Sequence, residues 1–147
     1  MMQTHSDILD AIRMHGAEAY PEECCGFLLG RITEHGNYVG AAMSVENRRE
    51  TSREQRFSIS AEDFHRADLA AREQGWDIVG FYHSHPDHPA RPSATDLAEA
   101  TFPGYTYAIV SVCGGDAEQI TAWSLRPDRS RFESEPIEII SEIFVTP

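Results

Sequence analysis

Hydrophobic positions near the start of the chain repeat with the period of a helix. Between Ser6 and Ala19, Ile8 and Ile12 can share one face, which predicts an amphipathic helix. Pro21 should follow its end, because the residue before a proline is disfavoured in helical conformation. The chain is therefore expected to open with a helix that packs one apolar stripe on a core.

Most of the remaining hydrophobic residues fall in short runs bounded by turn residues, a pattern typical of strands. The runs interpreted as strands are Cys24 to Arg31, Tyr38 to Met43, Phe57 to Ser60, Trp76 to Ser84, Tyr105 to Cys113 and Ala117 to Leu125. Gly114-Gly115-Asp116 predicts a hairpin between the last two. The apolar segment from Ile137 to Val145 is either a last strand or a short helix.

Two further helices are indicated by their capping residues. Ser60-Ala61-Glu62-Asp63 has the capping-box pattern, and Gly75 is placed to end that helix. A short helix is expected from Ser93 to Ala100. Glu46 to Arg56 has no apolar periodicity and is interpreted as a loop. This order predicts an α/β fold with a mixed β-sheet flanked by helices, in a single domain over residues 1–147.

Composition narrows the classes of function. With 41% hydrophobic and 24% charged residues, the 147-residue chain resembles an ordinary soluble globular protein. Its net charge is −12, and all 12 basic residues are arginine, which argues against general binding of nucleic acid. No apolar run approaches the roughly 18 residues of a membrane helix, and no secretory signal is visible, so a cytoplasmic protein is expected. Cys24, Cys25 and Cys113 form no CxxC pair and are predicted to be reduced, buried thiols.

The segment around His83-Ser84-His85 carries the clearest chemical signal. Side chains alternate along a strand, so His83 and His85 should emerge on the same face. Ten residues separate His85 from Asp96, and Ser93 stands three positions before this aspartate, on the same side of the expected helix. Two imidazoles and a carboxylate suit a zinc ion and leave a fourth position open, as in catalytic zinc sites.

A hydrolytic metal site also needs a group that accepts a proton from water and passes it to the leaving group. Glu22 and Glu23 both stand at the mouth of the apolar strand Cys24 to Arg31, where a carboxylate could serve this purpose. The physical pattern alone does not choose between them.

Three segments together resemble the JAMM (MPN-plus) metallopeptidase family. They are Glu23-Cys24-Cys25-Gly26-Phe27-Leu28-Leu29-Gly30, His83-Ser84-His85-Pro86 and Ser93-Ala94-Thr95-Asp96. The resemblance implies a cytidine-deaminase-like fold, and its register selects Glu23 over Glu22. It further implies that His83, His85 and Asp96 bind Zn²⁺, that Glu23 deprotonates a water, and that Ser93 helps to stabilise the oxyanion.

The same resemblance implies a substrate class. The family hydrolyses peptide or isopeptide bonds beside the C-terminus of ubiquitin-like proteins, and this short chain resembles its compact bacterial branch. Members of that branch act after the C-terminal Gly-Gly of a ubiquitin-like sulfur-carrier protein. Two alternatives are a non-catalytic MPN-type binding module, which the complete ligand set argues against, and a metallohydrolase of small amides.

The predicted loop concentrates four of the twelve arginines in an otherwise acidic chain. The simpler interpretation is a solvated loop with internal ion pairs. The alternative hypothesis is that Arg48, Arg49, Arg53 or Arg56 binds an acidic carrier surface or the carboxylate of the released residue, since the planar guanidinium suits carboxylates.

Overall fold

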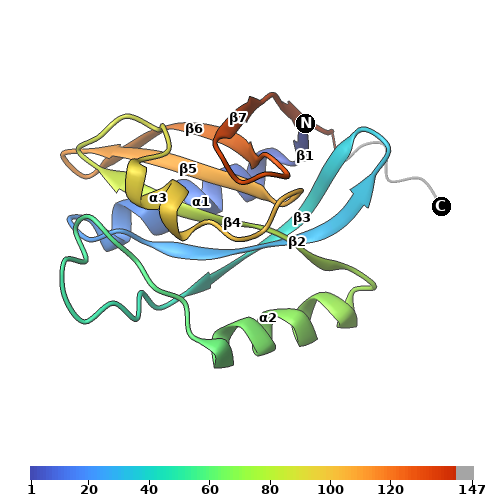
Figure 1. Cartoon of the computed structure of the whole chain (residues 1–147), viewed down its shortest axis with the longest axis horizontal. Helices are drawn as coiled ribbons and strands as arrows, with labels where there is room; N and C mark the ends of the chain where they lie inside the picture. The colour runs from blue at the N-terminus through green and yellow to red at the C-terminus, as the bar shows by residue number, and fades with distance from the viewer. Residues whose placement is uncertain (142–147) are drawn as a thin grey trace.

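An eight-stranded mixed sheet forms the centre of the molecule in the computed structural model, which describes residues 1–141 (Figure 1). The strands are β1 (Met2–Thr4), β2 (Cys25–Thr33), β3 (Gly36–Val45), β4 (Asp77–Pro86), β5 (Thr106–Cys113), β6 (Asp116–Leu125), β7 (Phe132–Glu135) and β8 (Ile137–Ile139). Their order is β7-β6-β5-β4-β2-β3-β1-β8. The pairs β4–β5, β1–β3 and β1–β8 are parallel and the others antiparallel, so the predicted mixed sheet is confirmed.

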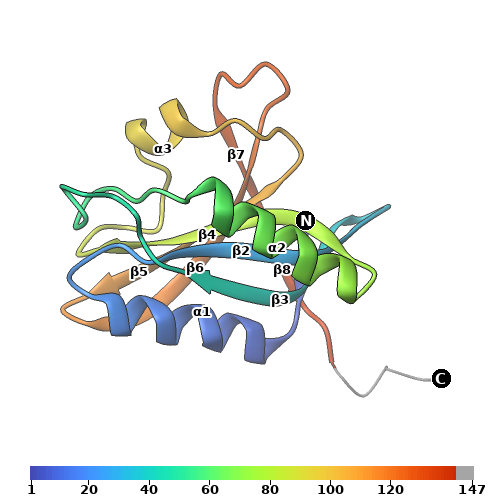
Figure 2. The same cartoon turned by 90° about the horizontal axis from the view of Figure 1, so that it is seen from below.

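Helices cover both faces of this sheet (Figure 2). The helices are α1 (Ser6–Ala19), α2 (Ala61–Glu73) and α3 (Ala94–Glu99). Alternation along the strands sends neighbouring side chains to opposite faces, where they form two buried clusters. Leu9, Ile12, Leu28 and Tyr82 belong to the cluster under α1, and Phe27, Ala67, Ala71 and Phe81 belong to the cluster under α2. None of the helices within residues 1–141 is long and apolar enough to cross a membrane.

The structure differs from the sequence-based prediction at several short segments. Residues 57–60 form no strand; this stretch is instead held by hydrogen bonds to residues 47 and 48. The strands β1 and β7 were not predicted, because each is only three or four residues long. β8 covers the start of the segment Ile137 to Val145, whose last four residues lie outside the described part. Cys24 and Cys25 are buried as expected, whereas Cys113 is exposed, so that prediction was wrong.

Candidate metal centre and adjoining cavity

The central strand β4 places two histidines side by side. Register pairs His83 with Cys25 of β2 on one side and with Ile109 of β5 on the other. Because side chains alternate along β4, His83 and His85 share one face of the sheet, where His83 lines a cavity together with residues of α2 and α3. Ser84 points to the opposite face, where it lies beside Gly16 of α1. Both imidazoles are buried, with His83 3% and His85 7% exposed.

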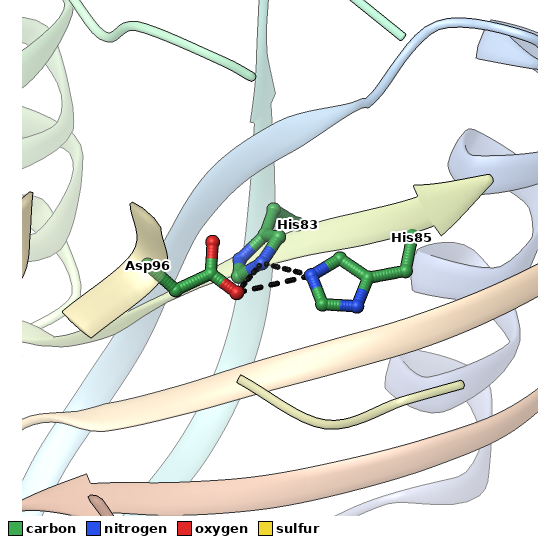
Figure 3. Close-up of side chains that lie close together, drawn as sticks. All are labelled: His83, His85 and Asp96. Carbon is green, nitrogen blue, oxygen red and sulfur yellow. Dashed lines mark hydrogen bonds and ion pairs between the residues drawn. The ribbon is translucent and has the colours of Figure 1, made fainter. Parts of the chain in front are cut away.

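The short helix α3 supplies a carboxylate and fixes its orientation. Ser93 caps the helix: its Oγ accepts a hydrogen bond from the backbone N–H of Asp96 at 3.0 Å. In return, the backbone N–H of Ser93 donates to Oδ2 of Asp96 at 2.8 Å. This reciprocal capping box holds the Asp96 side chain toward the histidines of β4 (Figure 3).

Three potential ligand atoms converge at one point (Figure 3). Nε2 of His83 lies 3.1 Å from Nε2 of His85, and Oδ2 of Asp96 lies 3.2 Å and 3.0 Å from these two atoms. Tetrahedral zinc ligands at about 2.0–2.2 Å from the ion stand about 3.3–3.5 Å apart, so this spacing fits zinc within a few tenths of an ångström. Nδ1 of His85 lies 2.9 Å from the carbonyl of Pro89, and when it donates there, Nε2 becomes the ligand atom of the neutral ring.

The electrostatics of this cluster favour a cation. Burial alone would raise the pKa of Asp96, but its hydrogen bonds to His83 and His85 outweigh burial and hold the pKa well below its usual range. Burial lowers the pKa of His85, and the bonds to Asp96 and Pro89 more than compensate, so that it is raised. Two ring nitrogens facing an ionised carboxylate need a positive charge between them, which a proton or a divalent metal can supply.

Glu23 lies at the entrance to β2 as a buried carboxyl. The side chain is 5% exposed, and its Oε1 has no hydrogen-bond partner among residues 1–141. Burial raises the pKa of Glu23 to about 8; His85 lowers it, and Asp96 and Glu99 raise it further. The neighbouring Glu22 is only partly buried. Glu23 and Glu22 therefore differ in burial, a difference that the pattern of the sequence did not reveal.

Hydrogen bonds from three segments fix the backbone at Glu23. Its N–H donates to the carbonyl of Arg53 at 2.7 Å, and its carbonyl accepts from Nδ2 of Asn47 at 3.1 Å. The next residue, Cys24, donates its N–H to Oγ of Ser84 at 2.8 Å and accepts from the N–H of Ser84 at 3.2 Å. These contacts tie the entrance of β2 to β4.

Sequence reasoning gave no role to two of the residues that shape the site. Ser84 was noted only as part of the motif, although a small hydroxyl residue between two same-face histidines must point to the opposite face and can bond a neighbouring strand. Phe57 stacks on His83, with ring centroids 4.8 Å apart and an interplanar angle of 27°. No sequence signal identifies Phe57, because its position depends on the irregular path of residues 47–60.

A cavity of about 330 Å³ adjoins the metal-ligand cluster. Its walls are mainly aromatic and aliphatic, and two of the three clustered residues, His83 and Asp96, line it as well. The apolar lining comprises Phe57, Ile59, Phe64, Phe81, Pro92, Ala100, Phe102, Tyr107, Ile109 and Phe132. Arg49 and Glu99 are the other charged residues in the lining. The site therefore combines a cation-binding centre with an apolar recess, a combination common in ligand pockets.

The four arginines of the predicted loop occupy different environments. Arg48 pairs with Glu46 at 2.9 Å, as the interpretation of internal ion pairs requires, and also with the buried carboxylate of Asp63 in α2 at 3.1 Å. Nε of Arg53 contacts the carbonyl of Arg49. Only Arg49 of the four lines the cavity. The loop is therefore partly structural and partly directed at the site.

Known proteins resemble this chain in sequence and in fold. A family model described as prokaryotic homologs of the JAB domain matches residues 5–126. The chain is 35% identical over 139 residues to the desampylase of Haloferax volcanii, covering 90% of this chain and 94% of that relative. It is similar to the solution structure of a Salinibacter ruber protein, with 59% identity, a TM-score of 0.77 and coverage of 96% and 93% of the two chains. A JAB1/MPN domain protein from Archaeoglobus fulgidus shares the fold, at 20% identity, a TM-score of 0.59 and coverage of 96% and 98%.

Proposed function

Because the chain belongs to the family of prokaryotic JAB-domain homologs, we propose that it is a zinc peptidase acting after the C-terminal Gly-Gly of a ubiquitin-like sulfur-carrier protein. One observation carries the proposal. Three convergent ligand atoms from His83, His85 and Asp96 lie in a site that also holds the buried, unpartnered carboxyl of Glu23. This set of groups matches hydrolysis by a metal-activated water.

Each residue has a distinct role in this proposal. His83, His85 and Asp96 hold the zinc ion, which when bound lowers the pKa of a water and polarises the scissile carbonyl. Glu23 accepts a proton from the attacking water and delivers it to the leaving nitrogen. Burial raises the pKa of Glu23 to about 8 in the metal-free protein, and the positive charge of a bound zinc ion would lower it again, which favours the carboxylate that accepts the proton.

Ser93 is proposed to stabilise the developing oxyanion. Its Oγ already accepts the N–H of Asp96, so the hydroxyl hydrogen is available to donate in another direction. Because the residue caps α3, this hydroxyl is held next to the ligand carboxylate rather than free to rotate away. A fixed donor at this place favours the transition state over the planar ground state.

The substrate class rests on two kinds of support. The relative from Haloferax volcanii is named a desampylase, which favours a ubiquitin-like modifier as substrate. The sulfur carrier follows from the resemblance to the compact bacterial branch.

The test is intact-mass analysis of a sulfur carrier extended beyond its Gly-Gly and incubated with the zinc-loaded protein. Cleavage after Gly-Gly is expected, and it should be lost with a chelator and in the Glu23→Gln variant, which keeps the shape of the side chain. Equal turnover of a free Gly-Gly-containing peptide would favour a small-amide hydrolase. Binding of the carrier without cleavage by the zinc-loaded protein would favour a binding module and refute the peptidase.

A further inference from the structure

We propose that the cavity beside the metal-ligand cluster binds the residue released from the carrier, and that it selects an apolar residue whose free carboxylate pairs with Arg49. This inference rests on the proposed function and adds a substrate preference to it. It assigns to the cavity a ligand with three features: an apolar side chain, a C-terminal carboxylate and the amine freed by hydrolysis.

The lining of the cavity fits an apolar side chain. Five phenylalanines and a tyrosine contribute to the walls, together with two isoleucines. Phe81 and Phe102 pack with centroids 5.5 Å apart, and Tyr107 and Phe132 meet edge to face at 5.2 Å, so the walls are braced against one another. A volume of about 330 Å³ lies at the lower end of the about 300–1,000 Å³ typical of ligand pockets. The cavity therefore suits one large side chain rather than a long peptide.

The charges at the cavity fit the two ends of an amino acid. The backbone of Arg49 is held by Oδ1 of Asn47 at 3.0 Å and by the contact of Arg53 with its carbonyl. Its guanidinium, in contrast, has no ion-pair or hydrogen-bond partner within residues 1–141. A partly buried guanidinium without a partner is suited to a carboxylate ligand. Glu99 lines the same cavity and offers the opposite charge for the freed amine.

The position of the cavity favours the released residue over the carrier tail. His83 and Asp96 line the cavity, so a scissile carbonyl at the metal centre lies at its edge. The residue after that carbonyl enters the cavity directly. Before the scissile bond, the two C-terminal glycines of the carrier have no side chains. The residue that precedes them is separated from the scissile bond by about 7 Å of extended chain. That preceding residue also has no free carboxylate for Arg49.

The experiment is an NMR titration of the zinc-loaded Glu23→Gln protein, which should bind peptides without cleaving them. The probes are Gly-Gly-Phe, its C-terminal amide and Gly-Gly-Gly. Gly-Gly-Phe is expected to bind at least about tenfold more tightly than either of the other two, since a charged hydrogen bond and a buried ring are each worth about that factor. Shifts should appear at residues that line the cavity.

A pair of arginine variants tests the role of the carboxylate. Arg49→Ala should remove the preference for the acid over the amide and keep the preference for Phe over Gly. Arg56→Ala is the matched control, because Arg56 is exposed, belongs to the same loop and does not line the cavity; it should keep both preferences. Equal effects of the two variants, or equal binding of acid and amide, would overturn the inference. A carboxylate bound by the zinc ion alone would leave the acid preference intact in Arg49→Ala and would also overturn it.

The experiments can refute the proposed pocket and the proposed peptidase activity independently of each other. Carrier cleavage after Gly-Gly without any preference in the tripeptide series would leave the peptidase standing and refute the pocket. The expected tripeptide preferences without carrier cleavage would support the pocket and refute the peptidase.

Discussion

Replacing Glu23 with glutamine should stabilise the metal-free protein at neutral and alkaline pH while it abolishes hydrolysis. The native carboxyl is buried, and its Oε1 has no hydrogen-bond partner among residues 1–141. Ionising it in the folded state is therefore unfavourable, and burial raises its pKa from the ordinary value of 4.5 to about 8. Glutamine has nearly the same shape and never ionises, so it avoids this penalty.

The pH dependence of this stabilisation follows from whether the carboxyl of residue 23 binds a proton in the folded and in the unfolded chain. Below pH 4.5 the carboxyl is neutral in both the folded and the unfolded chain, and the two proteins should differ little. As the pH rises toward 8, the unfolded carboxyl loses its proton and the folded one retains it, so the native protein steadily loses stability relative to the variant. The rise of the pKa from 4.5 to about 8 corresponds to about 5 kcal/mol of the free energy of unfolding. The buried amide, lacking partners of its own, should reduce the observed gain to about 2–4 kcal/mol.

The assay is urea unfolding with a chelator and a reductant at pH values from about 4.5 to 8.5. The free-energy difference between Glu23→Gln and the native protein should grow with pH and level off above about pH 8. Glu22→Gln is the matched control, because this neighbour is only partly buried, and its effect should be small throughout. A difference that stays constant with pH would refute the reasoning, since it would show that the carboxyl is not held neutral by the fold.

Three further outcomes are expected. Ser84→Ala should leave the N–H of Cys24 buried without its acceptor and destabilise the protein by about 1–3 kcal/mol in urea unfolding; an unchanged midpoint would contradict this. Asp96→Asn should weaken zinc binding by more than the loss of about 10–100-fold that is typical when a residue that only hydrogen-bonds a metal ligand is replaced; competition with a chromogenic chelator measures this affinity. Arg48→Ala should lower stability by about 1 kcal/mol through loss of its bond to buried Asp63, whereas Arg56→Ala should have almost no effect.

The parts of the site that obey a short-range rule could be predicted from the sequence. Alternation along a regular strand brings His83 and His85 to one face, and the capping box fixes Asp96 relative to Ser93. Both rules act within a few residues, so they hold whatever the rest of the fold does. The central strands and the helices α1 and α2 follow for the same reason, because each has its own periodic pattern.

The remaining features depend on contacts between distant segments. β1 is a three-residue strand that pairs with β8, and Met2 lies opposite Ile137, a partner that no local pattern indicates. The burial of Glu23 rather than Glu22 depends on the loop and on β4 packing over one side of the strand entrance. The cavity draws its walls from the loop, α2, β4, β5, β7 and the region of α3, so its existence follows only from the assembled fold.

The hydrogen bonds between Ser84 and Cys24 have a consequence for how this protein can diversify. They join the segment that carries two of the ligand atoms to the residue after the proposed base, on the face of the sheet opposite the chemistry. The two histidine ligands and the base are therefore linked through adjacent strands, and a shift of one strand would displace them together. New substrate preferences can then arise most readily at cavity residues that neither bind the metal nor hold the backbone of Glu23, such as Phe102 and Phe132.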